Sequence, residues 1–121
     1  MEKKKTMVIG ASPNPERFSY KAVSLLNYYQ HTVIPIGIKD GEIDGIEIIK
    51  GKPNVADLHT ITLYLGEKRQ VEYYDYILSL KPKRIIFNPG AENIELLKKA
   101  EQGGIEVTEN CTLVMLNAGI F

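Results

Sequence analysis

The chain has 121 residues, and its 15 lysines and arginines balance its 15 aspartates and glutamates, which gives a formal net charge of zero. This length is typical of one domain, and we expect a single domain over residues 1–121. The balanced charge excludes a general electrostatic attraction to nucleic acid or to an anionic membrane, so any bound anion must be held by local geometry. The single cysteine, Cys111, excludes an internal disulfide and a multi-cysteine metal site.

No stretch of the sequence has the run of about 20 apolar residues that a membrane helix needs. The apolar run at residues 7–9 is also too short to form the core of a secretion signal. We therefore expect a cytoplasmic protein whose partner is a small molecule, with no nucleic-acid or membrane partner.

The predicted elements alternate between short apolar runs and helical periods, which is typical of a parallel sheet whose strands are joined by helices. The first strand is predicted at residues 7–9 and ends in a turn over residues 10–15. Apolar side chains at helical spacings predict a helix over residues 19–30. A second strand follows at residues 32–38, and the glycine-rich residues 40–53 are predicted to form turns.

The second half of the chain continues the alternation, with strands predicted at residues 60–65, 84–87 and 105–108. The helix marked by apolar residues 71–78 must end before Pro82. The next helix has acidic side chains in its first turn and basic ones in its last, and Gly103 caps it. A short last helix is predicted at residues 113–116.

Five strands joined by helices predict an α/β fold, a Rossmann-like doubly wound parallel sheet with helices on both faces. We expect the strand order 3-2-1-4-5, in which the order of the strands across the parallel sheet reverses between strands 1 and 4. The turns that follow those two strands would then flank one crevice, which is where open α/β sheets bind their ligands.

The turn Gly10-Ala11-Ser12 is the strongest local signal, since it follows a buried strand and opens a helix. Free backbone N–H groups and the helix dipole attract phosphate in this position. Gly10 would let the backbone approach a ligand closely, Ser12 would add a hydroxyl donor, and Arg17 would neutralise charge. The alternative is an ordinary strand-to-helix turn in which Ser12 or Ser19 caps the helix.

Two further segments extend the candidate site. The second strand ends in Gly37-Ile38-Lys39, where an NAD site would need a carboxylate for the ribose, so Lys39 favours a phosphate near the adenosine, as in coenzyme A or NADP. The fourth strand ends in Asn88-Pro89-Gly90, which is a turn that the expected topology places beside Gly10.

Catalytic groups are hard to find in the sequence. His31 and His59 fall at the opposite end of the predicted sheet, and we expect His31 to be exposed. Cys111 has no histidine near it in sequence, and no acidic pair or metal-ligand spacing is visible. The sequence therefore predicts a binding site with no catalytic residue and no metal.

Residues 8–17 read Val-Ile-Gly-Ala-Ser-Pro-Asn-Pro-Glu-Arg and are followed by Ser19-Tyr20. This string resembles the small stand-alone CoA-binding domain proteins of bacteria, which are relatives of the nucleotide-binding domain of succinyl-CoA synthetase. The likeness continues in looser form to residues 109–111 and covers nearly the whole chain.

The resemblance implies a Rossmann-like protein that binds coenzyme A. Its pyrophosphate would lie on Gly10, Ala11 and Ser12, and the adenosine would lie near residues 37–39. The remaining residues that the resemblance or the turn implies for the site are Asn14, Arg17, Ser19, Tyr64, Leu65, Asn88, Pro89 and Gly90.

Three positions depart from the family pattern. Gly37 stands where the family usually has an asparagine, Leu65 stands where it often has an arginine, and Asn88 stands where it has a glutamine. Each change removes a polar contact, and we expect Lys68 or Arg69 to compensate from the following loop.

Three functions stay open at this point. The first is a non-catalytic module for coenzyme A or an acyl-CoA, and the second is a component of an enzyme that uses NADP or another nucleotide. The third is a degenerate member that acts as a protein interaction module. The apolar residues near the end of the chain, 113–116 and 120–121, could also cover a second copy, which makes a homodimer an expectation.

Overall fold

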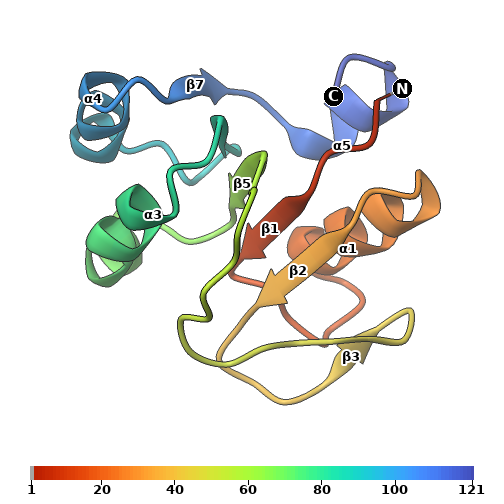
Figure 1. Cartoon of the computed structure of the whole chain (residues 1–121). Coiled ribbons are helices and arrows are strands. Elements are labelled where there is room, and N and C mark those ends of the chain that lie inside the picture. The colour runs from red at the N-terminus through yellow and green to blue at the C-terminus, as the bar shows by residue number, and fades with distance from the viewer. Residues whose placement is uncertain (1) are drawn as a thin grey trace.

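The computed structural model describes residues 2–121 and contains one central parallel sheet of five strands (Figure 1). The strands are β1 (Thr6–Ile9), β2 (Val33–Ile36), β5 (Thr60–Leu63), β6 (Arg84–Phe87) and β7 (Glu106–Glu109). Their order across the sheet is β2-β1-β5-β6-β7, and every neighbouring pair is parallel. The Rossmann-like α/β fold class is thereby confirmed.

The strand order corrects the sequence-based prediction. β1 pairs with β2 on one side and with β5 on the other, so Thr6 lies opposite both Val33 and Thr60. Counted along the chain as the five expected strands, the order is 2-1-3-4-5 and not 3-2-1-4-5. The place beyond β2 is closed to the third strand, because Ile49 forms a bridge to Ile36 there and donates its N–H to the Pro35 carbonyl.

The segment that closes this edge is a small hairpin, which was predicted only as turns. β3 (Glu42–Ile43) and β4 (Ile46–Glu47) pair antiparallel through the turn Asp44-Gly45. Both turn residues have positive φ, 50° and 81°, which matches the twist that a two-residue hairpin requires.

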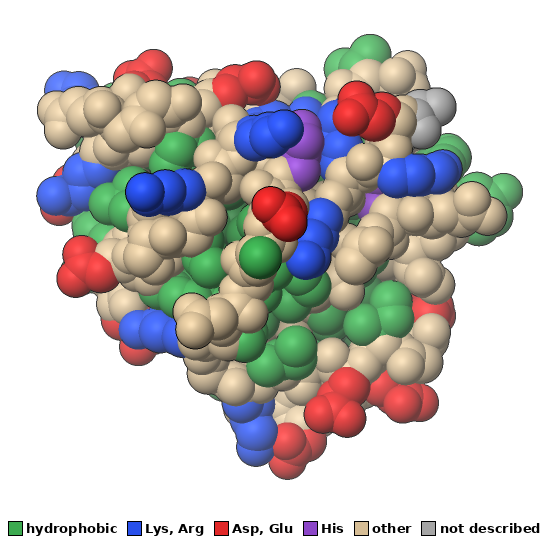
Figure 2. Space-filling model, viewed as in Figure 1, with side chains coloured by type: hydrophobic (Ala, Val, Ile, Leu, Met, Phe, Trp, Pro, Cys, Tyr) green, Lys and Arg blue, Asp and Glu red, His purple; other side chains and the backbone are tan. Residues whose placement is uncertain are grey.

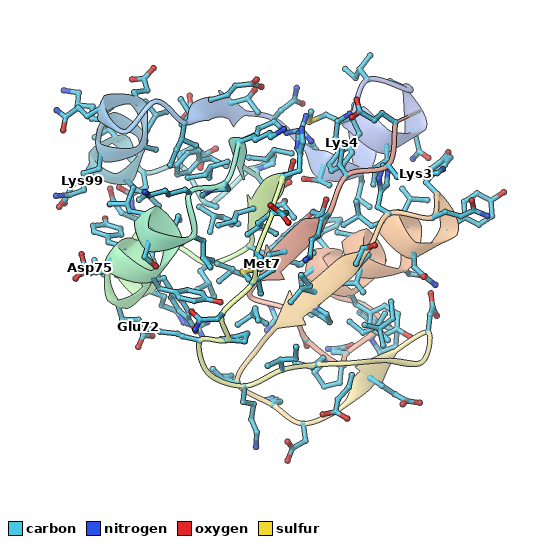
Figure 3. The ribbon with its side chains drawn as sticks, in the orientation of Figure 1. Lys3, Lys4, Met7, Glu72, Asp75 and Lys99 are labelled. Carbon is cyan, nitrogen blue, oxygen red and sulfur yellow. The ribbon has the colours of Figure 1, made fainter. Side chains whose placement is uncertain are left out.

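Helices cover both faces of the sheet, as predicted. α1 (Phe18–Tyr28) and α5 (Thr112–Asn117) pack on one face, over a core that includes Val8 and Ile86. The other face carries α2 (Glu67–Gln70), a 3₁₀ turn η1 (Val71–Tyr73), α3 (Tyr74–Leu80) and α4 (Ile94–Gln102). Its core includes Met7, which lies in the middle of the molecule in Figure 3.

Figure 2 shows one face of the molecule, on which acidic and basic side chains are scattered with hydrophobic side chains between them. This distribution agrees with the net charge of zero. Among residues 2–121, no helix has both the length and the apolar character that crossing a bilayer requires.

His31 is buried at the amino-terminal edge of the sheet, so the expectation that it is exposed is wrong. The backbone N–H of Lys4, a residue labelled in Figure 3, donates to His31 Nδ1 over 2.9 Å. The imidazole also packs on the ring of Phe121, with 5.0 Å between the ring centroids. Burial, reinforced by the nearby Lys3 and Lys4 ammonium groups, lowers the pKa of His31.

Candidate functional site

A cavity of about 460 Å³ opens at the carboxyl ends of β1, β2 and β5. Its volume lies within the range of about 300–1,000 Å³ that small-molecule sites occupy. The strand order explains its position, because the chain leaves β1 toward one face of the sheet and leaves β5 toward the other. The turns after β1 and β5 therefore flank the crevice, and the turn after β6, which was expected opposite that of β1, also contributes Pro89, Gly90 and Ala91 to its lining.

Most of the residues predicted from the sequence lie around this cavity. Those that line it are Gly10, Ala11, Ser12, Arg17, Ser19, Gly37, Ile38, Lys39, Tyr64, Leu65, Pro89 and Gly90. Asn14 and Asn88 are not among the lining residues. The lining also includes Arg69, which was expected only as an alternative to Lys68, and residues that were not predicted for the site, namely Pro13, Glu16, Phe18, Gly66, Tyr73 and Ala91.

The side-chain position of Gly10 faces the backbone of Tyr64 and not the open cavity. Its φ is 99°, and a Cβ atom built on it would lie 3.0 Å from the carbonyl carbon and oxygen of Tyr64. The N–H groups of Gly10 and Ala11 both donate to the Ile36 carbonyl, over 3.0 and 2.8 Å. These two N–H groups are therefore engaged within the protein, and the glycine serves the close contact between the ends of β1 and β5.

The start of α1 supplies the donors that the turn itself does not. Arg17 is the N-cap residue, no side chain caps the helix, and no acidic residue stands in its first turn. Phe18 and Ser19, the first two helical residues, line the cavity. The first N–H groups of a helix have no partner within it and carry partial positive charge, so this end of α1 is suited to an anion.

Asn14 holds the loop that leads into α1. Its side-chain oxygen accepts from the N–H of Glu16 over 3.0 Å, and its carbonyl accepts from the N–H of Arg17 over 3.0 Å. Its own N–H donates to Ser12 Oγ over 3.1 Å. Asn14 thus shapes the loop from behind the cavity, while Ser12 and Arg17 line the cavity itself.

Charge around the cavity is predominantly positive. Arg17, Lys39 and Arg69 line it, against the single carboxylate of Glu16. Arg69 belongs to the short helix α2, which follows β5, and its N–H donates to the Gly66 carbonyl over 3.0 Å. Of the two basic residues expected to compensate in this loop, Arg69 lines the cavity. The signal for it was present in the sequence, but spacing alone did not distinguish Arg69 from Lys68.

The three departures from the family pattern have structural explanations. Leu65 is buried in the core on the α3 side of the sheet, where it packs under Gly10. A Cβ atom on Gly37 would collide with the Ala11 carbonyl oxygen, so the close approach of the two loops requires glycine at that position.

Asn88 is only 2% exposed and is occupied by hydrogen bonds within the protein. Its Nδ2 donates to Thr62 Oγ1 over 2.6 Å and to the Leu63 carbonyl over 2.8 Å. Its Oδ1 accepts from the N–H of Thr112 over 2.9 Å. Asn88 therefore ties β5, β6 and the start of α5 together beneath the cavity.

The phenols near the cavity are held in their neutral form. Burial raises the pKa of Tyr64 far above its usual range, and its hydroxyl is enclosed without a hydrogen-bond partner in the described chain. Burial likewise raises the pKa of Tyr73. Among the described residues that line the cavity there is no histidine, cysteine or aspartate. The arrangement suits binding of an anion with an attached apolar or aromatic part.

Comparison with known proteins gives one family and several solved structures. A sequence model of the family described as "CoA binding domain" matches residues 4–117. A crystal structure of a protein described as uncharacterized has a TM-score of 0.97 and 47% sequence identity, with 100% of both chains covered.

More distant structures share the fold. A hypothetical protein from Pyrococcus horikoshii OT3 has a TM-score of 0.82 and 25% identity, covering 98% of this chain and 84% of its own. A structure named cell-free ID.343, from Thermus thermophilus, has a TM-score of 0.78 and 20% identity, covering 98% and 91% of the two chains. No curated protein matches the sequence at a significant level.

Proposed function

The chain belongs to the CoA binding domain family, and from that premise we propose that it is a non-catalytic module that binds coenzyme A or an acyl-CoA in the cavity beside β1 and β5. The observation that carries the proposal is the uncapped start of α1, which opens into a cavity lined by Arg17, Lys39 and Arg69. A coenzyme A molecule presents a diphosphate and a 3′-phosphate, and these anions match such a set of donors.

We assign the diphosphate to the first turn of α1, with Ser12 and Arg17 beside it. The adenosine and its 3′-phosphate belong at the end of β2, near Ile38 and Lys39, since an apolar side chain and a cation stand next to each other there. Arg69 takes the place of the arginine that the family often has at the position of Leu65. The free N–H groups at the helix start, and not those of Gly10 and Ala11, are the main-chain donors in this assignment.

The proposal of a binding module rests on the groups around the cavity. A general acid or base near neutral pH needs a pKa near 7. Burial moves the pKa of Tyr64 and of Tyr73 upward, away from that value. The other titratable groups that line the cavity are Glu16, Arg17, Lys39 and Arg69, and the three cations are suited to binding phosphate.

Titration calorimetry with coenzyme A, dephospho-coenzyme A, NADP, NAD and ATP tests the proposal. We expect coenzyme A to bind tightest and dephospho-coenzyme A to bind about tenfold more weakly, because one charge-assisted contact contributes about 1.5 kcal/mol or more. Lys39→Ala should remove that preference, while Lys98→Ala, on the exposed side of α4, should leave it unchanged.

Two results would contradict the proposal. Binding of NADP without binding of coenzyme A would favour a component of a nucleotide-dependent enzyme. Binding of none of the five ligands would favour a member of the family that has lost its ligand and acts through a protein partner.

A further inference from the structure

The outer sides of α1 and α5 form a second surface, which we call the α1–α5 face, and it is almost free of charge. Residues 18–32 contain a single lysine, Lys21, and no arginine or acidic residue, and residues 110–121 contain no charged side chain. A quarter of the residues in the whole chain are charged. Depletion of charge together with exposed tyrosine is typical of the centre of a protein–protein interface.

The α1–α5 face combines a groove with exposed apolar side chains. The groove, of about 430 Å³, runs between the two helices and is lined by Tyr20, Lys21, Leu25, Tyr28 and Leu113 among others. Tyr28 is 76% exposed at the end of α1, and α5 exposes Val114. Exposed apolar side chains that line a groove mark a docking surface more strongly than the same residues scattered singly.

We propose that the α1–α5 face joins two copies of this chain in a two-fold symmetric dimer. A neutral surface gives no electrostatic attraction to nucleic acid, to an anionic membrane or to a strongly charged protein. A second copy meets it without like-charge repulsion at its centre, and two-fold dimers are the commonest soluble assemblies.

The few polar groups at the groove are complementary under two-fold symmetry. Ser24 lies in the groove and donates its hydroxyl to Asp44 of the β3–β4 turn. Each copy therefore has one carboxylate, that of Asp44, at the margin of the groove, and one cation, Lys21, in its lining. With the α1 helices antiparallel about an axis beside Ser24 and Leu25, Tyr28 of one copy faces the second copy's Lys21. A lysine over an aromatic ring is favourable, and Lys21 already lies over the Phe18 ring at 5.5 Å.

Measurement of the mass in solution tests the dimer without any ligand. We expect sedimentation equilibrium of the wild-type chain to give twice the monomer mass of 13.6 kDa at micromolar to submillimolar concentrations. Tyr28→Lys places a lysine opposite the second copy's Lys21 at both symmetry-related positions and should raise the dimer dissociation constant at least about tenfold. Lys21→Glu should act in the same direction, because it replaces the cation that faces the second copy's Tyr28 ring with a carboxylate.

The matched control is Ile94→Glu, on α4 at the opposite face of the sheet, where the native side chain is 61% exposed. This variant should keep the wild-type mass, and circular dichroism should show that all three variants are folded. A wild-type chain of monomer mass at submillimolar concentration would overturn the proposal. So would a Tyr28→Lys variant that is still dimeric, or loss of the dimer in Ile94→Glu as well.

Discussion

Replacing Asn88 with alanine separates the structural role of this residue from the ligand contact that the sequence predicted for it. The side chain makes three hydrogen bonds, to Thr62 Oγ1, to the Leu63 carbonyl and from the Thr112 N–H, and it is buried. Each net hydrogen bond contributes about 1 kcal/mol, and its loss leaves buried partners without a substitute. Thr62 and Thr112 keep the hydrogen bond between their hydroxyls, so part of the network survives.

We therefore expect Asn88→Ala to lower the free energy of unfolding by about 3 kcal/mol, which for a chain of this length is a fall of roughly 10 °C in Tm. The affinity for coenzyme A, measured well below the Tm of the variant, should stay within about twofold of wild type, because Asn88 does not line the cavity. Thermal unfolding by circular dichroism and titration calorimetry give the two quantities.

Asn110→Ala is the matched control. Asn110 also follows a strand of the sheet, but it is exposed and its side-chain oxygen accepts only from the N–H of the next residue, Cys111. Its loss should change the unfolding free energy by no more than about 0.5 kcal/mol. If Asn88→Ala unfolds at the wild-type temperature but loses affinity for coenzyme A, the reasoning is refuted and Asn88 belongs to the binding site.

Three further predictions concern charge, backbone and pH. Arg69→Ala should weaken coenzyme A binding about tenfold at low salt and less at high salt, while Lys68→Ala should not; equal effects of the two in calorimetry would contradict a specific role. Gly10→Ala should destabilise the fold by about 1–3 kcal/mol in urea titration, and more than Gly45→Ala, whose φ is also positive but whose Cβ would meet open space. Because its folded pKa is lowered, His31 binds fewer protons in the folded than in the unfolded chain, so stability should fall as pH falls through about 6.5. His31→Gln should flatten that dependence in urea titrations between about pH 7 and pH 5, and an unchanged slope would exclude His31 as its source.

The sequence predicted the parts of the fold that local patterns encode. The strand at residues 84–87 and the helices around Leu26 and Leu96 follow from apolar periodicity, and the structure contains them. The strand order does not follow from such patterns. It depends on Ile49, which pairs with the outer edge of β2 and leaves β5 to pair with β1. The segment around Ile49 is too short to show an apolar periodicity, so the sequence does not predict this contact.

The burial of His31 was missed for a related reason. Histidine is intermediate in its tendency to be buried, and the place of His31 in a turn after a helix favoured exposure. In the structure, the backbone of Lys4 and the ring of Phe121 cover it from opposite ends of the chain. Contacts between segments so far apart in the sequence form only in the complete fold, and no local sequence pattern predicts them.

The proposed site keeps a cation although the residue that carries it differs from the family pattern. Leu65 points into the core beneath Gly10, where an arginine would have no room to remain buried without a partner. Arg69 stands four residues later, after the Gly66 turn, and lines the same cavity from the start of α2. A cation on a helix next to the cavity acts on a phosphate through the same Coulomb attraction as one in the preceding loop. The loss of the family arginine at Leu65 is therefore no argument that the site is inactive, and the comparison of Arg69→Ala with Lys68→Ala measures how much of that charge the cavity uses.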